Sequence, residues 1–298
     1  MRALLLAFLA TTAPVGCVKK LALHAMADQL ASGTGGAFTR DDDLAFVGEA
    51  LPFTLKLMES VHESTPEHPG LTLALCSGFT QYAVVYVLWP AERVRQEDLD
   101  AYEGGLERGR RMLARARGYC FEGLEQEHPG FGVALEADPD AALAPITAES
   151  VPLLYWASAA SLARISISKE DPEAIGGLPA AAAMAHRALV LDDTWAEGSV
   201  HELLIQLEPS LPLPGGAKRS RDHYARALEL SGGRRASVHV ALAESVSLPA
   251  QDHAEFDALL AKALAVEVAA DPDGQLANLY AQERAQFLLA RADDLFLE

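Results

Sequence analysis

Apolar residues recur along most of this chain with the three- and four-residue spacing of helices. Val151 to Trp195 shows it most clearly: a helix is expected from Pro152 to about Ser168, and a second from Pro179 to Asp192. Between them, the polar run Lys169–Glu173 contains Pro172, which lacks an amide donor and ends the first helix. This stretch therefore predicts a helical hairpin.

The end of the second helix recurs twice. Ala188-Leu189, Ala227-Leu228 and Ala263-Leu264 stand at intervals of 39 and 36 residues, each with an apolar residue three positions earlier. A repeat period between 20 and 50 residues is typical of stacked helical hairpins. Few Val, Ile or Thr runs alternate with period two, so strands are not expected. The pattern predicts an all-α fold of hairpins stacked in an α-solenoid.

Further helices are expected from the same spacing. They cover Val18–Leu30, Leu44–His62, Leu71–Trp89, Gly198–Leu207, Lys218–Leu230, Ser237–Val246, Phe256–Val266 and Leu276–Phe296. Leu71–Trp89 carries no formal charge and nearly spans a bilayer in length, but its polar interruptions and lack of basic flanks favour a helix buried among others.

Two polar motifs could suggest metal ligands. Asp41-Asp42-Asp43 precedes a predicted helix, where carboxylates cap free amides. Glu-His-Pro-Gly occurs at 67–70 and again at 127–130, where it is better interpreted as a helix boundary, because no further Cys or His stands at zinc spacing. We therefore expect no metal and no cofactor.

The amino terminus predicts export. Arg2, an apolar run from Ala3 to Ala13 and the sequence Pro14-Val15-Gly16-Cys17 resemble a lipoprotein signal peptide over residues 1–16, with lipid attached to Cys17. Residues 17–298 would then form a single domain. A plain secretory signal or an uncleaved anchor is the alternative. Cys76 and Cys120 are interpreted as buried free thiols, with a disulfide left open.

The net charge of −18 argues against nucleic-acid binding, since no basic face is available for phosphates. Phosphate loops, zinc-protease motifs and nucleophile elbows are absent from the sequence, so we expect that the protein is not an enzyme. His201 and Glu202 form the one adjacent pair suited to proton transfer. Tyr155, Trp156 and Trp195 are candidates for ligand or partner contact, because aromatic residues dominate such sites.

Several motifs together carry a family resemblance. They are the leader ending at Cys17, Val151–Trp156, Lys169–Glu173, Gly232-Gly233, Ala243–Asp252 and Asp293–Phe296. With them the chain resembles the T-component (TatT) family of tripartite ATP-independent periplasmic (TRAP) transporters. Arg187–Asp192 and Arg226–Leu230 resemble the second-helix ending of a tetratricopeptide repeat, although Asp193, Gly232 and Val268 replace its closing proline.

The resemblance implies degenerate tetratricopeptide-like hairpins in a lipid-anchored protein on the periplasmic face of the bacterial envelope. It also implies a homotrimer that binds the periplasmic solute-binding protein and helps to pass a small, hydrophobic ligand. Two alternatives remain open at this stage. One is a scaffold for envelope assembly, and the other is an envelope hydrolase that uses His201 and Glu202.

Overall fold

The structure, a computed structural model, describes residues 15–33 and 36–297. Helices account for 79% of the described residues, which contain no strand, so the predicted all-α class is confirmed. Most of the predicted signal peptide, residues 1–14, lies outside the described residues. The domain boundary after residue 16 and the lipid at Cys17 therefore stay predictions.

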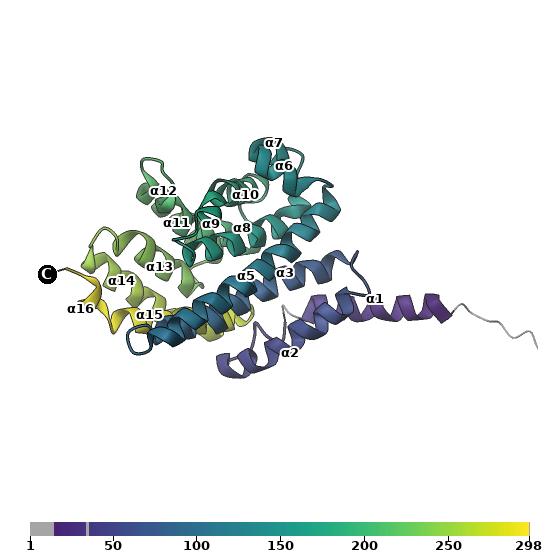
Figure 1. Ribbon diagram of the computed structural model, residues 1–298. Helices are drawn as coiled ribbons and strands as arrows, with labels where there is room; N and C mark the ends of the chain where they lie inside the picture. The colour runs from purple at the N-terminus through teal and green to yellow at the C-terminus, as the bar shows by residue number, and fades with distance from the viewer. Residues whose placement is uncertain (1–14, 34–35, 298) are drawn as a thin grey trace, which may run out of the picture.

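The helices follow one another with short connections (Figure 1). The α-helices of the amino-terminal half are α1 Val15–Gly33, α2 Leu44–His62, α3 Pro69–Ala83, α4 Trp89–Arg93, α5 Leu99–Glu127, α6 Phe131–Ala137, α7 Pro139–Leu143 and α8 Val151–Ser166. Those of the second half are α9 Pro172–Gly176, α10 Leu178–Leu191, α11 Trp195–Leu207, α12 Gly216–Ser231, α13 Ala236–Leu242, α14 His253–Leu264, α15 Gln275–Leu289 and α16 Ala292–Leu295. Two π-helical segments, η1 Val84–Leu88 and η4 Ala243–Ser247, and four 3₁₀ turns, η2 Ala148–Ser150, η3 Glu208–Ser210, η5 Val268–Ala270 and η6 Pro272–Gly274, complete the order.

Sequence neighbours pack against each other along the molecule: α3 against α5, α5 against α8, α8 against α10, α11 against α12, and α13 against α14. The three repeated alanines, Ala188, Ala227 and Ala263, all lie near the end of the second helix of such a pair and are at most 1% exposed. Their small side chains allow close helix contact. The tetratricopeptide-like and solenoid descriptions stay predictions.

The two Glu-His-Pro-Gly motifs are 60 residues apart, and three side-chain contacts also join residues 60 positions apart in the sequence. Tyr119 donates to Glu59 (2.9 Å), His62 lies 3.0 Å from Glu122, and the Gln126 amide donates to the Pro66 carbonyl (2.8 Å). A constant separation along both helices requires that α2 and α5 run parallel. His68 caps the start of α3 and His128 ends α5, so both motifs mark helix boundaries, as expected.

Asp43 also caps a helix as predicted, because its carboxylate accepts from the Phe46 amide at the start of α2.

The apolar stretch beginning at Leu71 forms α3, η1 and α4. Pro69–Arg93 and Pro172–Leu191 are each long and apolar enough to cross a membrane. In the first of them, Leu71 and Leu75 are fully buried within the protein, and 61% of an apolar 18-residue window is buried. The preference for a buried helix in this segment is thereby confirmed.

One sequence prediction is wrong. Cys76 in α3 and Cys120 in α5 are both buried but not free: they form a disulfide, with Cα atoms 4.9 Å apart. The two residues are 44 positions apart, and only the packing of α3 on α5 brings their Cβ atoms face to face. Spacing alone could not distinguish a pair from two separate apolar thiols.

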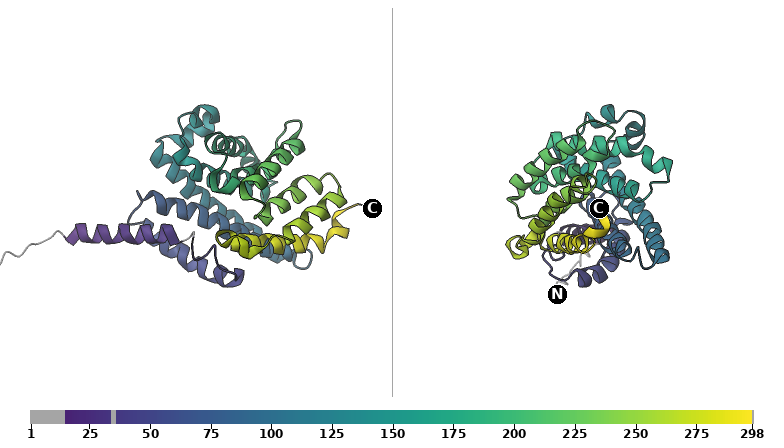
Figure 2. Two further views of the ribbon diagram at one scale, coloured as in Figure 1. Left: turned by 180° about the vertical axis from the view of Figure 1, so that it is seen from behind. Right: turned by 90° about the vertical axis from the view of Figure 1, so that its left-hand side faces the viewer.

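The carboxy-terminal helices return to the amino-terminal ones. The Leu276 amide donates to the Thr39 carbonyl (3.0 Å), and Arg40 forms an ion pair with Asp273 (2.6 Å). Trp89, just after η1, packs edge-on against Tyr280 and Phe287 of α15, with ring centroids 6.1 and 5.0 Å away. Figure 2 shows α15 beside the amino-terminal helices in both views. The chain thus closes on itself.

Candidate functional site

Three aromatic residues predicted from the sequence meet in the structure. The ring of Tyr155, on α8, lies 5.0 Å from that of Trp156 and 4.7 Å from that of Trp195, which begins α11. All three are only partly buried. We call these residues the aromatic cluster. Rings held together at such distances with accessible surface form a rigid apolar contact area.

Glu202 borders the aromatic cluster. Its negative charge and burial both raise the pKa of Tyr155, with burial the larger cause. Burial also raises the pKa of Glu202 itself, although Arg235 and a hydrogen bond with Ser237 oppose that shift. The aromatic cluster is therefore bordered by one poorly solvated acid, Glu202 of α11, and one cation, Arg235, which directly precedes α13.

A left-handed turn positions Trp195. Ala196, Glu197 and Gly198 take φ values of 46°, 55° and 88°, which non-glycine residues adopt only at a cost of about 1 kcal/mol or more each. Glu197 is held by an ion pair with Arg234 (3.0 Å). The Ser199 hydroxyl donates to the Ala196 carbonyl (2.9 Å). The surrounding contacts thus fix a strained turn next to the aromatic cluster, a combination that is frequent at functional sites.

His201 is not part of this arrangement. Neighbouring positions on a helix point in different directions, and His201 faces α12, where its Nδ1 lies 2.9 Å from Nδ1 of His223. Its Nε2 is buried without a hydrogen-bond partner, 3.8 Å from Asp193. The structure therefore places His201 against His223 of α12, whereas Glu202 lies beside the aromatic cluster.

A buried carboxylate, that of Glu208, lies beside the pair formed by His201 and His223. Glu208 is 2% exposed and accepts hydrogen bonds from His186 (2.8 Å) and Arg219, and these partners lower its pKa against the opposing effect of burial. His223 Nε2 lies 3.9 Å from the same carboxylate. These groups bind α10, α11 and α12 together.

Sequence reasoning missed Arg235, Ser237 and His223. Arg235 follows the Gly232-Gly233 turn, and its guanidinium reaches back to the Ser199 hydroxyl (2.6 Å), 36 residues earlier. A basic residue shortly after a glycine turn is a weak signal, because the same pattern is common on solvated surfaces. Within residues 15–33 and 36–297, no group of three or more His, Cys, Asp or Glu side chains could hold a metal ion.

Comparison with known proteins places the chain in a family. It is 27% identical over 267 residues to an uncharacterized protein of Treponema pallidum (strain Nichols), across 88% of this chain and 83% of that protein. The profile of the TRAP transporter T-component family matches residues 40–296, which covers α2 to α16. This protein therefore belongs to the TRAP transporter T-component family and is a component of a TRAP transport system.

Proposed function

We propose that this protein is a lipid-anchored scaffold on the periplasmic face of the envelope that binds the solute-binding protein of its TRAP system. In this proposal it also helps to pass a small, hydrophobic ligand. The family is one of transporter components and not of enzymes. The observation that carries the proposal is the partly exposed aromatic cluster of Tyr155, Trp156 and Trp195 beside Glu202 and Arg235.

This cluster has the composition of a protein contact site. Tyr, Trp and Arg are the residues whose truncation most often weakens interfaces, because rigid aromatic rings bury much apolar area at little entropic cost. The same rings would give a hydrophobic ligand an apolar surface. The left-handed turn at Ala196–Gly198 fixes the backbone beside Trp195 before any partner arrives, which reduces the entropy lost on binding.

Two features support the placement in the envelope. The leader ending at Cys17 has the pattern of a lipoprotein signal. The disulfide between Cys76 and Cys120 suits an oxidising compartment outside the cytoplasm. A Cys17→Ser variant is expected to lose metabolic labelling with palmitate and to leave the membrane fraction. A labelled Cys17→Ser variant would exclude acylation at this residue.

The homotrimer belongs to the same proposal and rests on the family resemblance. Native mass spectrometry of the detergent-extracted protein would show three copies and the added lipid mass together. A monomeric protein across the micromolar range would contradict the trimer without affecting the partner proposal.

The partner proposal is tested by measuring binding to the solute-binding protein of the same TRAP system. Trp195→Ala and Tyr155→Ala are expected to weaken the complex by about tenfold or more, as truncated interface aromatics do. Phe53→Ala is the matched control, because Phe53 is 73% exposed on α2 and lies outside the aromatic cluster. Equal losses for all three variants, or none, would refute the assigned surface. Circular dichroism of each variant confirms that it is folded.

A further inference from the structure

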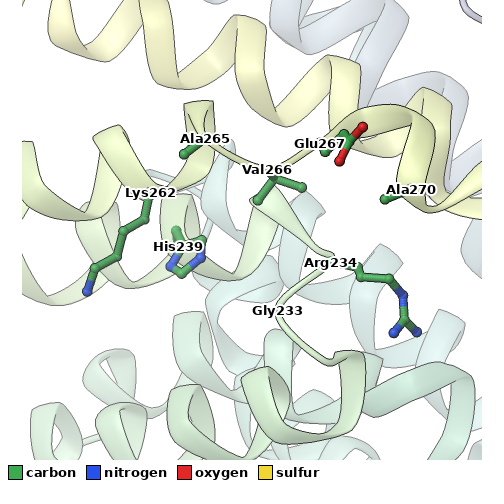
Figure 3. Close-up of a pocket in the computed structure, with 8 residues that line it drawn as sticks. All are labelled: Gly233, Arg234, His239, Lys262, Ala265, Val266, Glu267 and Ala270. Carbon is green, nitrogen blue, oxygen red and sulfur yellow. The ribbon is translucent and has the colours of Figure 1, made fainter.

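A second concave site lies away from the aromatic cluster. A pocket of about 330 Å³ opens between the turn that joins α12 to α13 and the carboxy-terminal end of α14 (Figure 3). The residues that define its chemistry are Gly233, Arg234, His239, Lys262, Val266 and Glu267. Its volume stands at the small end of the range for ligand sites.

His239 supplies a buried polar group to this pocket. His239 is only 7% exposed, and its Nδ1 atom lies 2.8 Å from the Tyr224 hydroxyl. Burial, with a smaller contribution from the Lys262 charge, lowers the pKa of His239 to about 4, so the ring is neutral at pH 7. We assign the hydrogen of this bond to the Tyr224 hydroxyl, which leaves the ring hydrogen on Nε2 as a donor.

Lys262 supplies the charge. It is exposed in the last turn of α14, and its side-chain ammonium group forms no ion pair or hydrogen bond with any residue in the part of the chain that the structure describes. Arg234, in contrast, is committed to Glu197 at 3.0 Å and points away from Lys262 in Figure 3. A lysine here also complements the helix dipole, which by itself requires no ligand. The neighbouring pocket and the buried His239 distinguish this site from a simple helix end.

The surroundings limit the ligand's charge. One unpaired ammonium group compensates one negative charge, and the carboxylate of Glu267 on the pocket wall would repel a second. Val266 and two alanines, Ala265 and Ala270, give the remaining wall an apolar character. We propose that this pocket binds a small monocarboxylate, whose oxygens accept from Lys262 Nζ and His239 Nε2 while its short hydrocarbon chain packs against Val266.

The probe for this site is butyrate, compared with its neutral isostere butyramide. Each is titrated into the full chain at constant ionic strength while amide chemical shifts are recorded by NMR. Butyrate is expected to cause saturable shifts at Gly233 and Val266, and butyramide to cause none. Equal responses to the two compounds, or no saturable shift with butyrate, would overturn the proposal.

Two substitutions separate binding from nonspecific charge effects. Lys262→Gln keeps an exposed chain of similar length but removes the charge, and is expected to weaken butyrate binding by about tenfold, the usual effect of losing one charge-assisted hydrogen bond. Lys218→Gln is the matched control, because Lys218 is 80% exposed on α12, pairs with Asp222 and does not line the pocket. Unchanged binding in Lys262→Gln would also overturn the proposal.

Discussion

The imidazole rings of His201 and His223 are hydrogen-bonded directly to each other, with their Nδ1 atoms 2.9 Å apart. One hydrogen serves this bond, so one ring donates and the other accepts, and a proton added to the acceptor removes it. Burial is the main cause that lowers the pKa of both rings, that of His223 to about 4, and the mutual charge of the pair lowers His223 further. The contact between α11 and α12 therefore requires neutral histidines.

Acidification should destabilise the protein through His223. In the unfolded chain a histidine takes up its proton near pH 6.5, whereas in the fold it does so near pH 4. Stability is thus fully present above pH 6.5 and is lost as the pH falls from 6.5 to 4. We expect a loss of about 2 kcal/mol between pH 7 and 4.5 from this group.

Urea unfolding at a series of pH values measures this loss. Glu208, Asp193 and Asp222 face the histidine pair with Arg219 and Arg226, and these groups persist in a His223→Gln variant. The slope of stability against pH between 4.5 and 6.5 should be smaller in that variant. An identical slope would show that His223 is not responsible.

The disulfide should contribute strongly to stability. Closing a loop between Cys76 and Cys120, 44 residues apart, reduces the entropy of the unfolded chain by about 4 kcal/mol in the loop-closure treatment. Reduction, or a Cys76→Ala/Cys120→Ala double variant, is expected to lower the free energy of unfolding by a comparable amount. Alkylation of both thiols in the unreduced, denatured protein would contradict the bond.

Arg284 of α15 stands between the two π-helical regions. Its guanidinium donates two hydrogen bonds to Glu244 of η4 (2.7 and 2.6 Å) and lies 5.4 Å from the ring centre of Trp89, directly after η1. Burial lowers the pKa of Arg284, but the charge of Glu244 and the hydrogen bonds to it, with the charges of Tyr280 and Glu92, together raise that pKa above its ordinary value. The ion pair thus joins α15 to η4, and the contact with Trp89 joins α15 to the first half of the chain.

Removing one partner of this pair should therefore be costly. Glu244→Gln leaves an uncompensated, partly buried cation, and we expect a loss of about 2 kcal/mol. A cycle with Arg284→Met and the double variant should give a coupling energy of about 1 kcal/mol or more by denaturant unfolding. Additive effects would mean that the two side chains act independently.

Replacing a glycine with alanine is expected to have opposite effects on stability at Gly198, in the strained turn beside Trp195, and at Gly118, inside α5. At Gly198, φ is +88° and an added Cβ would lie 3.1 Å from Leu230, so Gly198→Ala should destabilise the protein by about 1–2 kcal/mol. Gly118 lies inside α5 with nothing within 4 Å of an added Cβ, so Gly118→Ala should stabilise by roughly 0.5–1 kcal/mol. Thermal unfolding of both variants would show this contrast, and losses of equal size would contradict the strain.

Helical spacing was sufficient for much of this architecture. The bounds of α2 match the prediction from Leu44 to His62, and the repeated alanines lie at buried helix ends. Local patterns could not show the π-helical turns at Val84–Leu88 and Ala243–Ser247, because one extra residue per turn leaves little trace in an apolar run. Nor could they show that Ala196 and Glu197 are left-handed, since surrounding contacts impose that conformation on residues that normally avoid it.

The candidate site was predictable only in part. Aromatic type alone was enough to select Tyr155, Trp156 and Trp195, which the fold brings together from α8 and α11. Adjacency in sequence was misleading for His201 and Glu202, because helix geometry directs them apart. The partners that complete each environment, Arg235 and His223, come from later elements and are determined by tertiary packing.

We propose that this T-component docks the solute-binding protein of its own TRAP system through the aromatic cluster. The most direct test of this proposal is the equilibrium affinity between the two purified proteins, measured with the wild type and with Trp195→Ala. We expect saturable binding with a Kd in roughly the micromolar range, weakened by about tenfold or more in the variant. An absence of binding by the wild type in mild detergent, with the lipid and disulfide intact, would contradict the account.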